Sequence, residues 1–211
     1  MTKKLFWEDP YQTECEAKVV EIEGKKVRLD KTIFYAFSGG QASDKGKIGG
    51  IEVKEAIKEG KEIYYILETE PNFKVGDNVK VEIDWNRRYK IMRLHSATHI
   101  VYHFLSRKLG IKKLIGSNIS ENKGRIDFEY PEAVTKYIEE LEREVNNFIS
   151  KPTKIETFFT DEKNERRMWV CGEVKMPCGG THVKSTDEIG KVKLKRKNIG
   201  RGKERIEIRV E

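Results

Sequence analysis

The chain has 211 residues, of which 37% are hydrophobic and 36% are charged. This balance is typical of a globular protein, and no run approaches the roughly 18 to 20 apolar residues that a membrane span needs. The first residues also lack the apolar core of a signal peptide, so we expect a cytoplasmic protein without a membrane partner. The formal net charge is +7, with basic residues dense between Lys191 and Arg205, a distribution that either an RNA partner or a solvated strand pair would explain.

The first part of the chain alternates between polar and apolar residues in short segments broken by glycines. We predict strands at residues 17–22, 26–29, 51–57, 62–67 and 78–84. Gly24 suits a hairpin turn, and Gly49-Gly50 marks a further reversal. Residues 1–86 are therefore predicted to form a β-rich, barrel-like N-terminal domain that carries a glycine-rich motif.

Two helices are predicted in the rest of the chain. Residues 86–109 carry apolar side chains at helical spacing until Gly110 ends the run, and a second helix is expected to begin at Pro131. We expect both helices to pack against a sheet, with strands at residues 125–129, 153–159, 169–174, 191–197 and 204–210. The predicted fold class is α+β, with residues 87–211 as a second domain.

The histidines suggest a metal site in this second domain. His95 and His99 are four residues apart on a predicted helix, which places both imidazoles on one face. Cys178 and His182 flank two glycines that would let the backbone fold tightly enough for a thiolate and an imidazole to meet. Thiolate and imidazole ligands favour zinc, so we predict one zinc ion per chain.

Other residues near these positions fit a metal site less well. His103 lies about 12 Å along the helix from His95, too far to share one tetrahedral ion with it. Cys171 is expected to be a buried structural thiol. Ser96, Ala97 and Thr98 separate the two histidines, whereas a helical zinc protease places its general-base glutamate directly after the first histidine.

Several motifs resemble the editing domain of alanyl-tRNA synthetase. The metal motifs are residues 93–99, reading RLHSATH, and residues 178–183, reading CGGTHV. Residues 34–44, reading FYAFSGGQASD, resemble the glycine-rich motif of that family, and residues 202–207, reading GKERIE, resemble its terminal motif. The resemblance runs across most of the chain from about Thr32.

A chain of this length has no room for the catalytic core of the synthetase, so it resembles the freestanding, medium-length editing proteins. The resemblance implies a hydrolase that removes serine, with glycine as a second candidate, from the acceptor end of tRNA for alanine. Thr32 matches a position just before the aromatic pair of the glycine-rich motif, where its hydroxyl could pair with that of serine. Gln41 is the candidate for orienting the substrate. The alternatives without a functional role are that Thr32 is an ordinary strand threonine and that Gln41 lies in a simple turn.

The sequence leaves several alternatives open. The zinc ion could be catalytic, with three protein ligands and an open position, or could organise the pocket with four. A zinc-stabilised RNA-binding module without catalytic activity would use the same residues, and so would a deacylase of another mischarged tRNA. Basic residues at the start of the first helix, Arg87, Arg88, Lys90 and Arg93, are candidates for phosphate contacts. No oligomeric state is predicted.

Overall fold

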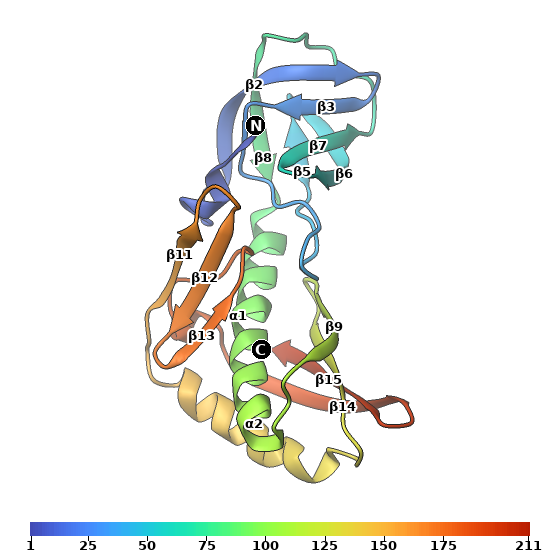
Figure 1. The fold of residues 1–211 in the computed structure, drawn as a ribbon. Coiled ribbons are helices and arrows are strands. Elements are labelled where there is room, and N and C mark those ends of the chain that lie inside the picture. Colours follow the sequence, from blue (N-terminus) through green and yellow to red (C-terminus); the bar gives the residue numbers. More distant parts are fainter. The chain divides into compact units, whose positions relative to one another are not determined.

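The computed structural model describes all 211 residues and confirms an α+β chain with two α-helices and many strands (Figure 1). Its internal contacts divide the chain into two compact units. The first comprises Met1–Ser38 and Ala42–Tyr89, and the second comprises Gly39–Gln41 and Lys90–Glu211. The second unit thus includes three residues of the glycine-rich motif. We keep the predicted domain boundary near residue 86 as a proposal.

The first unit contains a closed barrel of antiparallel strands in the order β2-β3-β7-β6-β5-β8. Its strands are β2 (Glu14–Glu23), β3 (Lys26–Leu29), β5 (Gly46–Ile48), β6 (Ile51–Glu59), β7 (Glu62–Leu67) and β8 (Asn78–Ile83). The short strands β1 (Lys3–Lys4) and β4 (Lys31–Thr32) pair in parallel, and the 3-10 turn η1 (Leu5–Trp7) follows β1. The sequence did not predict β5, because three residues are too few for an alternating pattern.

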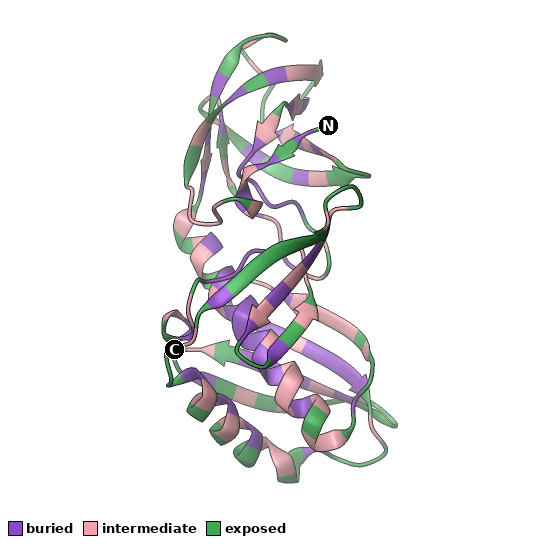
Figure 2. Cartoon of the chain, turned by 60° about the vertical axis from the view of Figure 1, so that its left-hand side comes forward, coloured by how far each residue is buried: buried purple, intermediate pink, exposed green.

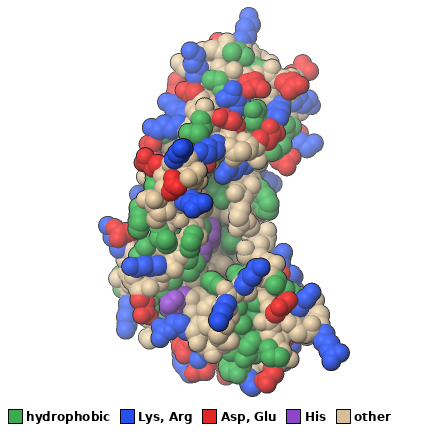
Figure 3. All heavy atoms as spheres, in the orientation of Figure 1, with side chains coloured by type: hydrophobic (Ala, Val, Ile, Leu, Met, Phe, Trp, Pro, Cys, Tyr) green, Lys and Arg blue, Asp and Glu red, His purple; other side chains and the backbone are tan.

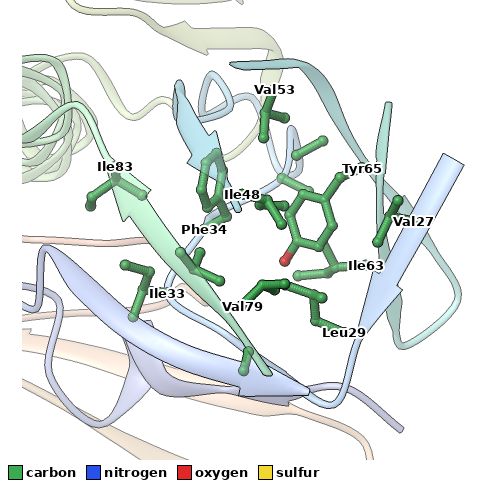
Figure 4. Close-up of a cluster of buried hydrophobic side chains, with 14 of the residues drawn as sticks. Val27, Leu29, Ile33, Phe34, Ile48, Val53, Ile63, Tyr65, Val79 and Ile83 are labelled. Carbon is green, nitrogen blue, oxygen red and sulfur yellow. The ribbon is translucent and has the colours of Figure 1, made fainter. Parts of the chain in front are cut away.

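Alternate strand residues fill the interior of the barrel, as expected when one face of each strand is buried. Figure 4 shows the aliphatic side chains pointing toward one another around the Tyr65 ring, which is fully buried. Closure also removes the unpaired strand edges that would otherwise invite aggregation. The barrel is therefore stabilised both by its apolar core and by a continuous hydrogen-bond ladder.

The helix α1 (Trp85–Leu109) begins after Asp84, whose carboxylate accepts a hydrogen bond from the Arg87 N–H at 3.0 Å. It ends at Gly110, where φ is +68° and the N–H donates to the Ser106 carbonyl at 2.9 Å. Between Ile91 and Val101, most residues are buried on every side of the helix. This part of α1 is therefore enclosed, rather than laid with one stripe on a sheet.

Two of the four basic residues at the start of α1, Arg88 and Arg93, bind other parts of the protein. This corrects the prediction that all four contact phosphates. Arg88 is fully buried; it pairs with Asp44 and donates to the Pro10 carbonyl at 2.9 Å. In the second unit, Arg93 donates to the carbonyl of Ile189 at 2.9 Å and to that of Glu211 at 2.7 Å. A buried arginine satisfied in this way cannot turn toward a phosphate without leaving its partners unpaired.

A four-stranded antiparallel sheet forms much of the second unit, in the order β14-β15-β10-β9. These strands are β14 (Val192–Gly200), β15 (Lys203–Val210), β10 (Gly124–Glu129) and β9 (Leu114–Ile119). Ile126, Phe128, Ile206 and Ile208 are buried on one side of the sheet. On the same side, Gly124 lies so close to Thr98 of α1 that an added Cβ would be 2.5 Å from the threonine hydroxyl oxygen. The segregation of buried and exposed residues along these strands is visible in Figure 2.

The helix α2 (Thr135–Ile149) covers the free edge of β14 with polar side chains. The Asn146 amide accepts from the Val192 N–H at 2.8 Å and donates to its carbonyl at 2.9 Å, and Glu142 accepts from the Leu194 N–H at 2.9 Å. These bonds satisfy an edge that would otherwise lack partners. The prediction that Pro131 lies in the first turn is wrong, because the helix begins four residues later.

A second sheet contains β11 (Ile155–Asp161), β12 (Arg166–Cys171) and β13 (Val174–Pro177) in that order, all antiparallel. The single strand predicted at residues 169–174 is wrong. Gly172 adopts φ +56° and turns the chain between β12 and β13. A short 3-10 turn, η2 (Thr186–Glu188), precedes β14. No helix is both long enough and apolar enough to cross a membrane.

Candidate metal centre

Four side chains of the second unit converge in one cluster. His95 and His99 come from successive turns of α1, and Cys178 and His182 come from the segment that follows β13. One ligand atom from each residue lies within 4.8 Å of all the others. His95 and His182 are buried, and the other two are half-buried. The structure therefore brings together the four residues that the sequence selected as a possible metal site.

Three of the separations in this cluster are close to those around a tetrahedral ion. Sulfur-to-metal and nitrogen-to-metal bonds of about 2.3 and 2.0 Å place neighbouring ligand atoms about 3.3 to 3.6 Å apart. The Cys178 Sγ is 3.4 Å from the His95 Nε2 and 3.5 Å from the His182 Nε2, and the Nε2 atoms of His99 and His182 are 3.1 Å apart. Several lone pairs thus face a common point, where a cation would be stabilising.

Burial keeps the three imidazoles in the neutral form that a metal requires, but it disfavours the thiolate form of Cys178. Desolvation lowers the pKa of His95 to about 4 and keeps those of His99 and His182 well below the usual value, so these imidazoles are neutral. Burial raises the pKa of the Cys178 thiol to about 11, and the Gly180 N–H and the Arg167 guanidinium offset only part of this effect. A bound divalent ion would displace the thiol proton and stabilise the thiolate.

Gln41 lies against the cluster and holds His95 in one orientation. Its Oε1 accepts from the Thr181 N–H at 3.0 Å and is 2.7 Å from the His95 Nδ1, while its Nε2 donates to the Thr181 Oγ1 at 2.9 Å. Because Oε1 is an acceptor, the proton of neutral His95 belongs on Nδ1. The Nε2 lone pair is then left to face Cys178, which is the tautomer that a metal ligand needs.

Two glycines allow this close approach. Gly40 adopts φ +84° beside β9, and a Cβ at this residue would lie 2.8 Å from the Ser117 carbonyl oxygen. Its own carbonyl accepts from the Ile119 N–H at 2.7 Å, which anchors the motif to the strand edge. A Cβ on Gly180 would collide with the His95 ring and lie 2.5 Å from the Gln41 Oε1. Gly180 is thus needed for space, whereas the sequence suggested only tight folding of the backbone.

Strand β12 supplies neighbours that the sequence analysis missed. The fully buried Trp169 ring lies 4.9 Å from the His99 ring and 5.9 Å from the His182 ring, centroid to centroid. The guanidinium of Arg167, two residues earlier on the same face, is close enough to lower the pKa of Cys178. No local pattern marks these residues, because they reach the cluster only through the folding of a separate sheet.

The remaining candidates lie elsewhere. Thr32 is fully buried in the first unit, where its hydroxyl accepts from the Phe34 N–H at 2.9 Å and from the Tyr65 hydroxyl. Its role toward a substrate stays a prediction. His103 is outside the cluster, with its Nε2 3.9 Å from a Glu173 oxygen, and Cys171 is a buried free thiol.

Comparison with known proteins gives two family matches. Residues 5–87 match the class II (A) tRNA synthetases, and residues 170–207 match the second additional domain of threonyl- and alanyl-tRNA synthetases. The second match includes Cys178 and His182 of the cluster.

Individual relatives extend this similarity over the whole chain. The alanyl-tRNA editing protein AlaX-M of Pyrococcus horikoshii is 40% identical over 100% of this chain and 99% of its own length. The AlaX-M of Saccharolobus solfataricus is 34% identical over 98% of each chain. An alanine–tRNA ligase of Methanococcus maripaludis is 34% identical over 98% of this chain, which spans 26% of the ligase.

Proposed function

Since the chain belongs to the family of alanyl-tRNA editing proteins, we propose that it hydrolyses the ester bond of tRNA for alanine that carries a wrong amino acid. The observation that carries this proposal is the convergence of His95, His99, Cys178 and His182 in a protein that matches editing proteins along its full length. The acceptor end of the mischarged tRNA is the proposed partner.

We propose that this cluster holds one zinc ion, because a thiolate with neutral imidazoles is the donor set that zinc prefers. A zinc ion with one open coordination position would polarise water or the ester carbonyl, whereas a fully ligated ion would organise the pocket. The neutral histidines need no proton removed before binding. Gln41 fixes the His95 tautomer, and the buried Trp169 ring packs against His99.

Serine is the proposed amino acid to be removed, with glycine as the second candidate. Serine differs from alanine by one hydroxyl, and a site that requires a hydrogen bond to it can discriminate strongly because alanine would leave polar groups unpaired. Thr32 remains the residue proposed to read this hydroxyl, and Gln41 is proposed to act through His95.

The test is deacylation of seryl-tRNA for alanine, compared with alanyl-tRNA and with a zinc-stripped sample. Zinc-dependent loss of serine with alanine spared is expected. If serine stayed attached while the tRNA still bound, the protein would be a zinc-stabilised RNA-binding module instead. Parallel assays with glycyl-tRNA for alanine and seryl-tRNA for threonine measure the range of substrates.

A variant of the metal cluster links the reaction to the site. Cys178→Ala should bind zinc poorly and lose deacylation, whereas Cys15→Ala, which changes a thiol in the first unit, should retain both. Full deacylation by Cys178→Ala would refute the proposed metal site.

A further inference from the structure

One face of the four-stranded sheet carries aligned basic side chains. Residues directly opposite in antiparallel strands share a face. Lys193, Lys195 and Lys197 of β14 lie opposite Arg209, Glu207 and Arg205 of β15, and Arg125 of β10 also lies opposite Glu207. The intervening residues, such as Ile206 and Ile208, are buried on the other side. We call the face formed by Arg125, Lys193, Lys195, Lys197, Arg205 and Arg209 the basic face.

Two nearly buried carboxylates hold part of this array in place. Asp127 accepts from Arg125 and from the Arg205 Nε at 2.7 Å. Glu207 lies 3.1 Å from the Lys197 Nζ and also accepts from Lys123, contacts that lower its pKa to about 2. Each carboxylate binds two cationic side chains. Each set of three side chains therefore has a net positive charge, and its long basic side chains are held in place.

The cations of the basic face outnumber the carboxylates that bind them. Lys195 and Arg209 are exposed and make no ion pair. Lys193 lies directly opposite Arg209, and of these two only Lys193 has a carboxylate partner, with its Nζ 2.9 Å from a Glu142 oxygen. Lys197 and Arg205 also lie directly opposite each other, and Glu207 and Asp127 offset part of their charge. Like charges in such cross-strand pairs are destabilising. Such a local loss of stability is expected at a binding surface, and a bound anion would relieve this repulsion.

An extended polyanion fits this geometry better than a small anion. Cations at alternate residues recur about every 6.7 Å along a strand and about 4.8 Å across strands, so they are spread over the sheet and do not converge on one point. The tip of the β14–β15 hairpin lies at the lower right of Figure 1, and basic side chains project at the same place in Figure 3.

We propose that the basic face binds the phosphate backbone of the tRNA substrate, an inference that rests on the proposed function. Phosphate contacts of this type position an RNA without reading its sequence, and they make affinity depend on salt. The basic face would thus supply affinity and orientation, while the amino acid is recognised elsewhere.

The test replaces Lys195 and Arg209 together by glutamine, since both are exposed and unpaired and the change should leave folding intact. The control variant carries Lys54→Gln and Lys74→Gln, two exposed lysines of the first unit with the same total charge change. Binding of uncharged tRNA for alanine is measured over a range of salt concentrations, together with hydrolysis of 3′-O-seryl adenosine, which lacks the tRNA body.

The double variant should bind tRNA about tenfold more weakly at low salt, with a log–log salt slope shallower by about 1.5, because each lost phosphate contact removes about 0.7 to 0.9. Hydrolysis of seryl adenosine should match wild type. Unchanged tRNA binding, or a loss equal to that of the control, would overturn the assignment of the basic face. If wild type left seryl adenosine and seryl-tRNA intact, the proposed function would fail, while the binding data would still decide the face.

Discussion

Replacing Gln41 by leucine tests whether this residue acts through the metal centre. Leucine is similar in size but offers no acceptor to the His95 Nδ1–H or to the Thr181 N–H, both of which the Oε1 now satisfies at 2.7 and 3.0 Å. The site is buried, so water cannot readily replace the lost acceptor. His95 would then favour the tautomer with its proton on Nε2, which faces Cys178 and opposes metal binding.

The expected loss can be worked out from these contacts. Leaving a buried donor unpaired costs about 1 to 3 kcal/mol. If binding of the ion demands the Nδ1–H tautomer, that cost appears as a zinc affinity lower by roughly 10- to 100-fold, which is also the usual effect of removing a hydrogen-bond partner of a metal-bound histidine.

Zinc affinity is best measured by competition with a chromophoric chelator, which needs no substrate. Gln41→Glu keeps an oxygen acceptor and should remain close to wild type. Gln12→Leu, at the other glutamine of the chain, is the matched control. Unchanged zinc affinity in Gln41→Leu, accompanied by slower deacylation, would refute this reasoning and favour direct orientation of the substrate by Gln41.

Three further changes have defined outcomes. Gly180→Ala should force the His95 ring to move and reduce zinc affinity at least tenfold, so a full equivalent of tightly bound zinc would contradict the steric argument. Thr32→Val should lower the free energy of unfolding by about 1 to 3 kcal/mol because the buried Tyr65 hydroxyl loses its acceptor, whereas Thr32→Ser should lose less; equal denaturation midpoints for both variants and wild type would argue against this bond. Glu207→Gln should be less stable than wild type at neutral pH. Since the folded-state pKa of Glu207 is lowered to about 2, that difference should shrink as pH falls from about 4.3 toward 2, and a difference independent of pH would exclude the ion pairs as its source.

Local signals account for much of what was predicted. The strands predicted at residues 26–29 and 62–67 match β3 and β7, because apolar and polar residues alternate along a half-buried strand and this pattern can be read from consecutive residues. The end of α1 at Gly110 was also predicted, because glycine readily adopts the positive φ found there. The spacing of His95 and His99 places them on one helical face whatever else the chain does.

Only the tertiary structure decided how distant segments meet. The carboxamide of Gln41 and the β12 residues Trp169 and Arg167 reach the metal cluster through packing between segments far apart in the sequence, which no local periodicity encodes. Burial likewise separates the structural Arg88 from the exposed Lys195, although both are basic residues in basic stretches. The sequence by itself determined the donor atoms and their local spacing. Folding determined which polar atoms fix those donors and which charges remain at the surface, because burial and hydrogen-bond partnership depend on the assembled core.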